Sequence, residues 1–148
     1  MPDRLCLAVN SGSSSIKFAL YRVDDTSKPV LRGSANLSET PSFKYTLDDN
    51  EHKKELTKGI EYQDTFTEIL KELTREEILQ GRTIELSAHR IVHGGEESEP
   101  VVIQHGRKEE KVILDKMDAV SDFAPLHNHH AMLSMSLVVP VQYRLLTP

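Results

Sequence analysis

Several features that would narrow the class of this protein are scarce or missing in its sequence. Cys6 is the single cysteine among 148 residues, so no internal disulfide can form. No segment reaches the roughly 18 consecutive apolar residues of a membrane-spanning helix, and the N-terminal apolar run meets a polar turn too early for a signal peptide. Basic residues are in the minority, 18 against 23 acidic ones, whereas nucleic-acid binding favours the opposite excess. We therefore expect a cytoplasmic protein without membrane or nucleic-acid partners.

The first third of the chain has the pattern of a β-meander. A short apolar run at 5–9 and alternating patterns at 16–23 and 43–47 predict strands, and a further strand is expected over 30–37, after Pro29. Polar turn residues separate them, with Asn10-Ser11-Gly12 between the first two runs and Asp48-Asp49-Asn50 after the last. The first two strands should therefore form a hairpin.

The middle and last parts alternate between helical and strand patterns. Apolar residues at helical spacing predict a helix through residues 66–73, with a capping box from Thr65 and Glu68 and a stop at Gly81. A strand over 84–92, a loop with a short apolar run at 101–103, and a second helix over 113–124 ended by Pro125 follow. In the tail, a strand begins near Val138. This order predicts an α/β fold with a mixed sheet and packed helices.

The first segment that could carry chemistry is Asn10-Ser-Gly-Ser-Ser-Ser-Ile-Lys17. Gly12 allows a tight turn, while Ser13, Ser15 and Lys17 share one face if a strand begins there. Two hydroxyls and an ammonium would suit a polyphosphate. The segment is no Walker A loop, which needs a following helix and a Gly-Lys-Ser/Thr ending. The alternative is a solvated serine-rich turn.

The second segment is Ala88-His-Arg-Ile-Val-His-Gly-Gly95. Arg90 lies near the end of a strand, before a flexible Gly-Gly turn, and a guanidinium is well suited to bind carboxylate or phosphate. His89 and His93 would lie on the strand face opposite Arg90 and Val92. The alternative is a strand with one surface ion pair.

The third segment, Ala124-Pro-Leu-His-Asn-His-His130, follows the second predicted helix. His127 at a Pro-Leu turn is a candidate hydrogen-bond donor in a site. Three histidines in four residues could bind a metal, but no acidic or thiol partner has suitable spacing. A solvated loop is the alternative.

Taken together, the three segments resemble the acetate kinase family of the sugar kinase/Hsp70/actin superfamily. The matching stretches are LAVNSGSSSIKF (7–18), AHRIVHGGE (88–96) and APLHN (124–128). The resemblance implies an incomplete first lobe of an actin-like ATPase fold, with a ribonuclease H-like mixed sheet. It places that lobe at residues 1–130, with a divergent or truncated tail at 131–148.

The resemblance also implies an activity and roles for single residues. The family transfers a phosphoryl group from ATP to acetate, giving acetyl phosphate and ADP, with Mg²⁺, and its members form homodimers. By this resemblance, Arg90 and His127 are catalytic, and Arg90, Val92 and Leu126 bind the acetate. The ATP phosphates would be bound by Asn10, Ser13, Ser15 and Lys17, with Asn10 near Mg²⁺.

The sequence departs from the family pattern at two places. His129 replaces the proline that usually follows APLHN, and residues 138–148 contain nothing like the F-D-T-A-F-H segment with the catalytic aspartate. We therefore expect the chain alone to be inactive, because that aspartate and the nucleotide lobe are missing. Two alternatives stay open: a propionate or butyrate kinase, and a non-catalytic fragment that binds phosphate or a partner.

Overall fold

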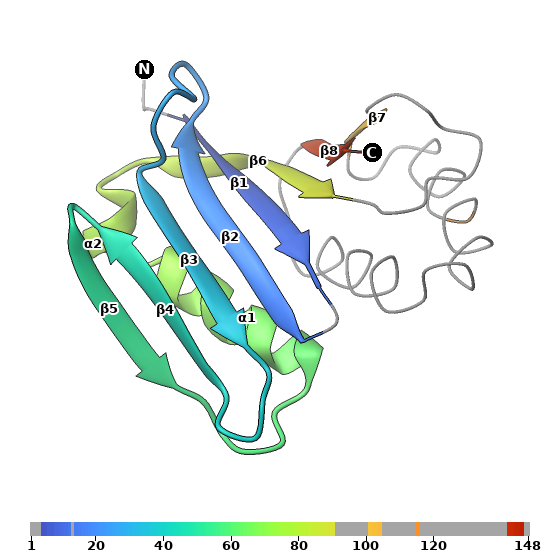
Figure 1. Ribbon diagram of the computed structural model, residues 1–148. Helices are drawn as coiled ribbons and strands as arrows, with labels where there is room; N and C mark the ends of the chain where they lie inside the picture. The colour runs from blue at the N-terminus through green and yellow to red at the C-terminus, as the bar shows by residue number, and fades with distance from the viewer. Residues whose placement is uncertain (1–3, 13, 91–100, 105–114, 116–141, 147–148) are drawn as a thin grey trace.

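A computed structural model describes residues 4–12, 14–90, 101–104, 115 and 142–146 of the chain. They form one eight-stranded sheet with the strand order β5-β4-β3-β2-β1-β6-β8-β7 (Figure 1). The strands are β1 (Arg4–Ser11), β2 (Ser15–Arg22), β3 (Leu31–Asn36), β4 (Ser42–Leu47), β5 (Asn50–Glu55), β6 (Thr83–Arg90), β7 (Val101–Gln104) and β8 (Gln142–Leu146).

The sheet mixes antiparallel and parallel pairing. Strands β1 to β5 form an antiparallel meander, whereas β6 lies parallel to both β1 and β8, and β7 pairs antiparallel with β8. The predicted hairpin, meander and mixed α/β sheet are confirmed. Except for Asp115, which is helical, the second predicted helix lies outside the described residues, as do residues 131–141 of the tail.

The fifth strand was not predicted. Asp48 and Asp49 have positive φ angles of 50° and 62°, and the flanking residues Leu47 and Asn50 are cross-strand partners. Such a two-residue turn matches the twist of an antiparallel hairpin. Every residue of β5 is exposed, so its sequence lacks the alternation by which strands are recognised.

The helices begin and end differently from the sequence prediction. Helix α1 (Tyr62–Leu73) starts after Glu61, with no side-chain cap. The predicted capping box is therefore wrong: the Thr65 hydroxyl lies within the first turn and donates a hydrogen bond of 2.9 Å to the carbonyl of Glu61. A second short helix, α2 (Glu76–Leu79), ends at Gln80 in the left-handed conformation, and Gly81 follows with a φ of +76°.

One face of the sheet packs against α1 and forms the core. Figure 1 shows α1 and α2 behind the sheet, and no described helix in front of it. The core contains these buried side chains: Leu5, Leu7, Val9, Ile16, Phe18, Leu20, Leu31, Ala35, Phe43, Tyr45, Tyr62, Phe66, Ile69, Leu73 and Ile78. None of the helices in the described part is long and apolar enough to cross a membrane.

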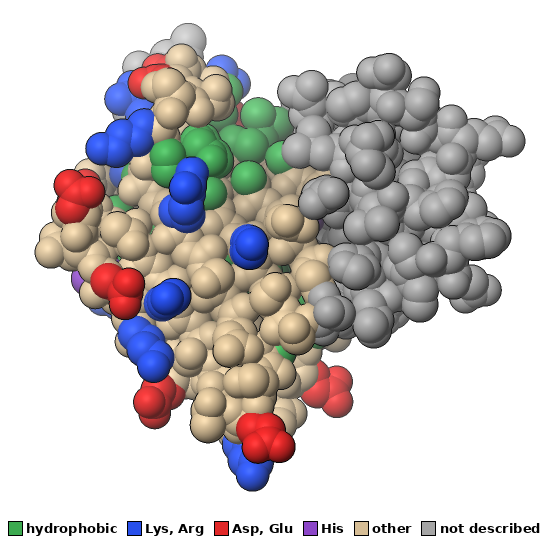
Figure 2. All heavy atoms as spheres, viewed as in Figure 1, with side chains coloured by type: hydrophobic (Ala, Val, Ile, Leu, Met, Phe, Trp, Pro, Cys, Tyr) green, Lys and Arg blue, Asp and Glu red, His purple; other side chains and the backbone are tan. Residues whose placement is uncertain are grey.

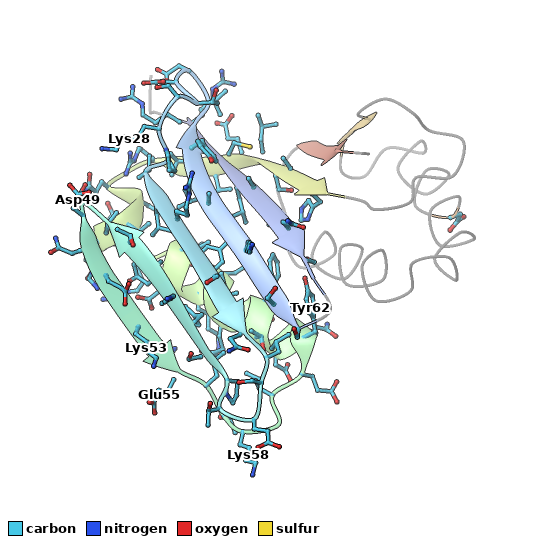
Figure 3. The ribbon with its side chains drawn as sticks, in the orientation of Figure 1. Lys28, Asp49, Lys53, Glu55, Lys58 and Tyr62 are labelled. Atoms are coloured by element: carbon cyan, nitrogen blue, oxygen red, sulfur yellow. The ribbon has the colours of Figure 1, made fainter. Side chains whose placement is uncertain are left out.

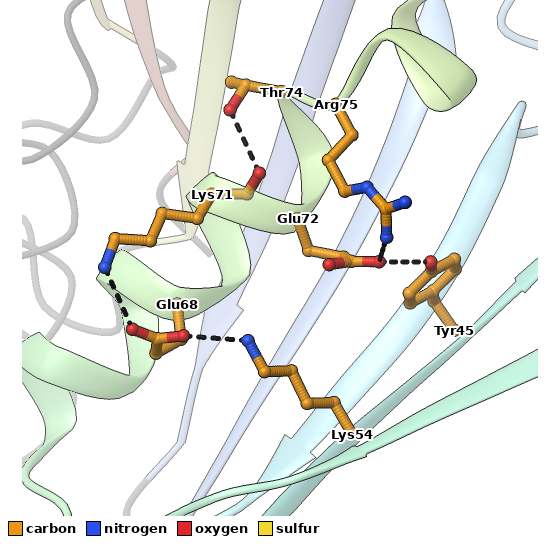
Figure 4. A network of polar contacts seen from close by, with 7 residues as sticks. All are labelled: Tyr45, Lys54, Glu68, Lys71, Glu72, Thr74 and Arg75. Atoms are coloured by element: carbon orange, nitrogen blue, oxygen red, sulfur yellow. Dashed lines mark hydrogen bonds and ion pairs between the residues drawn. The ribbon is translucent and has the colours of Figure 1, made fainter.

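Polar contacts hold the β4–β5 hairpin against α1 (Figure 4). The Tyr45 hydroxyl donates a 2.7 Å hydrogen bond to Glu72, which also accepts from Arg75 at 3.0 Å. Glu68 accepts from Lys54 at 2.9 Å and from Lys71 at 3.2 Å. These contacts fix the outer part of the sheet to the helix that packs under its centre.

Candidate anion-binding site

A tight turn joins β1 to β2 and positions the first predicted segment. The backbone N–H of Gly12 donates a 2.8 Å hydrogen bond to the carbonyl of Ser15. A Cβ atom at Gly12 would lie 3.1 Å from the Ser15 hydroxyl oxygen and 3.3 Å from the Ser15 carbonyl oxygen. Glycine at this position therefore lets the hydroxyl of Ser15 approach the turn closely.

Asn10 and Lys17 lie next to each other at this end of the sheet. They are cross-strand partners on β1 and β2, and both side chains are exposed on the face opposite α1. Both line a groove of about 700 Å³ on that face. Ser15 lies two residues before Lys17 on β2, so these two residues share a face as predicted. Ser13 lies outside the described residues.

Strand β6 brings the second segment to the same end of the sheet. Its parallel pairing with β1 aligns His89 with Val9, and Arg90 and Asn10 are the next residues on the two strands. The carboxyl ends of neighbouring parallel strands are a preferred place for ligands in α/β sheets. The fold thus places the backbones of the first two segments next to each other. Val92, Leu126 and His127 lie outside the described residues.

Buried polar side chains support this end of the sheet from the α1 side. The hydroxyls of Ser11 and Tyr62 are hydrogen-bonded to each other, and Figure 3 shows Tyr62 beside the end where β1 stops and β2 begins. His89 and Ser87 are fully buried, with 2.9 Å between the His89 Nε2 atom and the Ser87 Oγ atom. Burial lowers the pKa of His89 to about 3, so the imidazole is neutral at physiological pH. The sequence analysis did not identify Tyr62 as part of this region, because the residue that it contacts, Ser11, lies 51 positions away in the chain.

The donor chemistry of the site suits an anion better than a metal ion. A hydroxyl, an amide and an ammonium can all donate hydrogen bonds to phosphate oxygens. Magnesium usually needs one or two carboxylates besides the substrate phosphates. Among the described residues, no group of three His, Cys, Asp or Glu side chains could hold a metal ion. These residues therefore do not fit a magnesium site by themselves.

The comparisons with known proteins identify the family of the chain. The model of the acetokinase family matches residues 5–141, which include all three motif segments. The chain belongs to the acetokinase family. The predicted family resemblance is confirmed.

Relatives and solved structures of this family are much longer than the chain. The acetate kinase of Borreliella burgdorferi is 32% identical over 141 residues, which are 91% of this chain and 33% of that protein. The crystal structure of Porphyromonas gingivalis acetate kinase has a TM-score of 0.77 at 20% identity, covering 97% of this chain and 37% of that one. A propionate kinase from Francisella tularensis has a TM-score of 0.74 at 27% identity, with 99% and 37% covered. The chain thus spans about a third of the length of the curated relatives.

Proposed function

We propose that this chain supplies the phosphate- and acetate-binding part of an acetate kinase. The reaction is the transfer of the γ-phosphoryl group of ATP to acetate, which yields acetyl phosphate and ADP. One observation carries the proposal: Asn10 and Lys17 are paired on a groove at the end of β1 where parallel β6 brings in Arg90. The substrates are anions, and the exposed ammonium of Lys17 supplies a positive charge that attracts them.

The chemistry of the reaction requires binding groups more than a strong base. The acetate carboxylate is already ionised at neutral pH, so it can attack the phosphorus atom without losing a proton. Its approach to a phosphate is opposed by repulsion between two anions. Positively charged and hydrogen-bonding groups offset that repulsion, and phosphoryl transfer depends mainly on such positioning and electrostatic stabilisation.

Each predicted site residue has a role in this proposal. Asn10, Ser15 and Lys17 hold phosphate oxygens, and Arg90 binds both the carboxylate and the transferring phosphoryl group. His127 stabilises charge on that group. The remaining roles are assigned to Ser13 for a phosphate oxygen and to Val92 and Leu126 for the walls around the acetate methyl group.

Several further properties stay predictions. They are the use of Mg²⁺ bound mainly through substrate phosphates, homodimer formation, a cytoplasmic location, and a lobe boundary at residue 130. No step in the proposed mechanism depends on them. We also expect the isolated chain to make no acetyl phosphate, since the aspartate-bearing strand and the nucleotide lobe of the family are missing from its sequence.

A chimera tests the proposed function directly. The chain would replace the matched third of Borreliella burgdorferi acetate kinase, and acetyl phosphate would be trapped as hydroxamate. We expect the chimera to turn over, and Lys17→Met and Arg90→Ala to reduce kcat/KM by about 100-fold or more, the scale on which lost electrostatic groups act. Lys58→Met, a lysine away from the site, is the control. A folded but inactive chimera, or an active Arg90→Ala variant, would contradict the proposal.

The likeness to a propionate kinase structure favours one alternative substrate. An extra methylene group changes binding by only about 1–3 kcal/mol, so family membership alone does not select between acetate and propionate. The chimera should therefore be assayed with both acids. A higher kcat/KM for propionate would assign the chain to that alternative.

A further inference from the structure

The residue that follows Asn10 is held from the other side of the sheet. Side chains alternate between the two faces of a strand, so Asn10 lies on the groove face, over which Figure 2 shows Lys and Arg side chains, while Ser11 faces α1. Ser11 is 4% exposed and Tyr62 is 7% exposed, and their hydroxyls are hydrogen-bonded to each other. This contact therefore acts on the backbone directly beside a proposed phosphate-binding residue.

Tyr62 belongs to a firmly packed part of α1. It is the first residue of the helix, and its side chain lies in the same core cluster as those of Phe66 and Ile69, which follow at helical spacing on one face. The hydroxyl and the backbone N–H of Thr65 both donate hydrogen bonds of 2.9 Å to the carbonyl of Glu61, which fixes the first turn. The Tyr62 hydroxyl can therefore hold the end of β1 in one position.

Backbone hydrogen bonds fix the β1–β2 turn within the sheet layer. Gly12 donates to the carbonyl of Ser15 at 2.8 Å, and Leu37, the residue after β3, donates to the carbonyl of Ser14 at 2.9 Å. The contact between the Ser11 and Tyr62 side chains is of another kind, because it joins the turn to the helix layer. It controls the position of the end of β1 relative to α1.

We propose that Tyr62 is a positioning residue for the phosphate-binding turn between β1 and β2. Its hydroxyl holds Ser11 from the α1 side, away from the substrates, and thereby keeps Asn10 beside its cross-strand partner Lys17. Loss of the contact lets the end of β1 shift, and a shift of about 1 Å in a binding group can cost about 100-fold in rate. The inference rests on the proposed function, because only there is Asn10 assigned to a phosphate.

Hydrogen exchange on the full chain tests the positioning without any measurement of turnover. In Tyr62→Phe we expect the amides of residues 11–15 to exchange about tenfold faster, since the open state of the turn no longer has to break this contact. Ile69→Val, a change at a fully buried residue of α1, is the control for a general loss of stability and should leave these amides within about twofold. Unchanged exchange in Tyr62→Phe, or equal acceleration in Ile69→Val, would overturn the inference.

The chimera with Borreliella burgdorferi acetate kinase connects the contact with the reaction. Tyr62→Phe and Ser11→Ala should each lower kcat/KM for ATP about tenfold, whereas KM for acetate stays within about twofold because acetate is assigned to other segments. The double variant should lose no more than either single variant, since both remove the same contact.

Tyr21→Phe, which removes a half-buried hydroxyl elsewhere on β2, is the matched control and should keep the parental kcat/KM. Additive losses in the double variant, or a fully active Tyr62→Phe chimera, would refute the positioning role. A folded parent chimera without turnover would instead contradict the proposed function, and with it the part of Tyr62 in the reaction, whatever the exchange result.

Discussion

The hydroxyl groups of Ser11 and Tyr62 are hydrogen-bonded to each other although the residues lie 51 positions apart. Ser11 ends β1 and Tyr62 begins α1, and both side chains are buried. This contact fixes the end of the sheet that carries Asn10 and Lys17 to the first turn of the helix beneath it.

Tyr62→Phe should weaken this connection without changing the shape of the core. We expect the free energy of unfolding to fall by about 1–2 kcal/mol, because the Ser11 hydroxyl stays buried and loses this partner. Urea denaturation followed by circular dichroism measures the change. Tyr21→Phe on β2 is the matched control, since it removes a half-buried hydroxyl elsewhere in the sheet. An equal loss of unfolding free energy in both variants would show that the contact with Ser11 contributes no more than an ordinary half-buried hydroxyl.

Gly33→Ala should destabilise the sheet strongly. A Cβ atom at this position of β3 would lie 2.5 Å from the carbonyl oxygen of Lys44 and 2.5 Å from the ring of Phe18. Since a backbone oxygen and a buried ring must both move, we expect a loss of about 1–3 kcal/mol. Ser34→Ala, the next residue on β3, should cost much less in the same thermal or urea unfolding experiment. A Gly33→Ala variant as stable as the parent would contradict the close packing.

The burial of His89 predicts a loss of stability in acid. Burial lowers the pKa of His89 from 6.5 to about 3, so between these values the unfolded state binds more protons than the folded state. This group should therefore lower the free energy of unfolding by about 1.4 kcal/mol per pH unit as the pH falls from 6.5 towards 3. His89→Gln should flatten that dependence in urea unfolding at pH 7, 6 and 5. Exposed His52→Gln is the control, and a parental slope in His89→Gln would refute the assignment.

Tyr45 predicts the opposite dependence in alkali. Burial and the hydrogen bond to Glu72 raise the pKa of Tyr45 from 10.0 to about 12. The fold favours the neutral phenol, so this part of the stability is present below pH 10 and is lost as the pH rises towards 12. Tyr45→Phe should lose about 1 kcal/mol at pH 8 and show a smaller decline between pH 9 and 11. Tyr21→Phe, in contrast, should keep the parental decline.

Local sequence patterns were sufficient to predict the first strands and the main helix of the described fold. The apolar run LCLAV and the alternation in IKFALYRV predicted β1 and β2, because one face of each strand is buried against α1. The apolar spacing of Phe66, Ile69 and Leu73 predicted the body of α1 for the same reason. Motif spacing also indicated the family, since three short segments in order are far more specific than any one of them.

Other features depend on contacts that no local pattern records. β5 has no buried face, so only its two-residue turn and its pairing with β4 define it. The start of α1 depends on packing of Tyr62, and the predicted cap residue Thr65 is buried in the first turn instead. The positions of Arg32 and Lys44 in the same groove as Lys17 follow from the strand register, which the sequence does not specify between distant strands.

The charged strand β5 also has a consequence for how the chain behaves at high concentration. It lies at one edge of the sheet, where unpaired backbone groups can recruit a strand from another molecule and start aggregation. Its sequence, Asn-Glu-His-Lys-Lys-Glu, places ionised side chains along that edge. A second molecule that added a strand there would have to desolvate these side chains. The charges of β5 therefore oppose aggregation through this edge of the sheet.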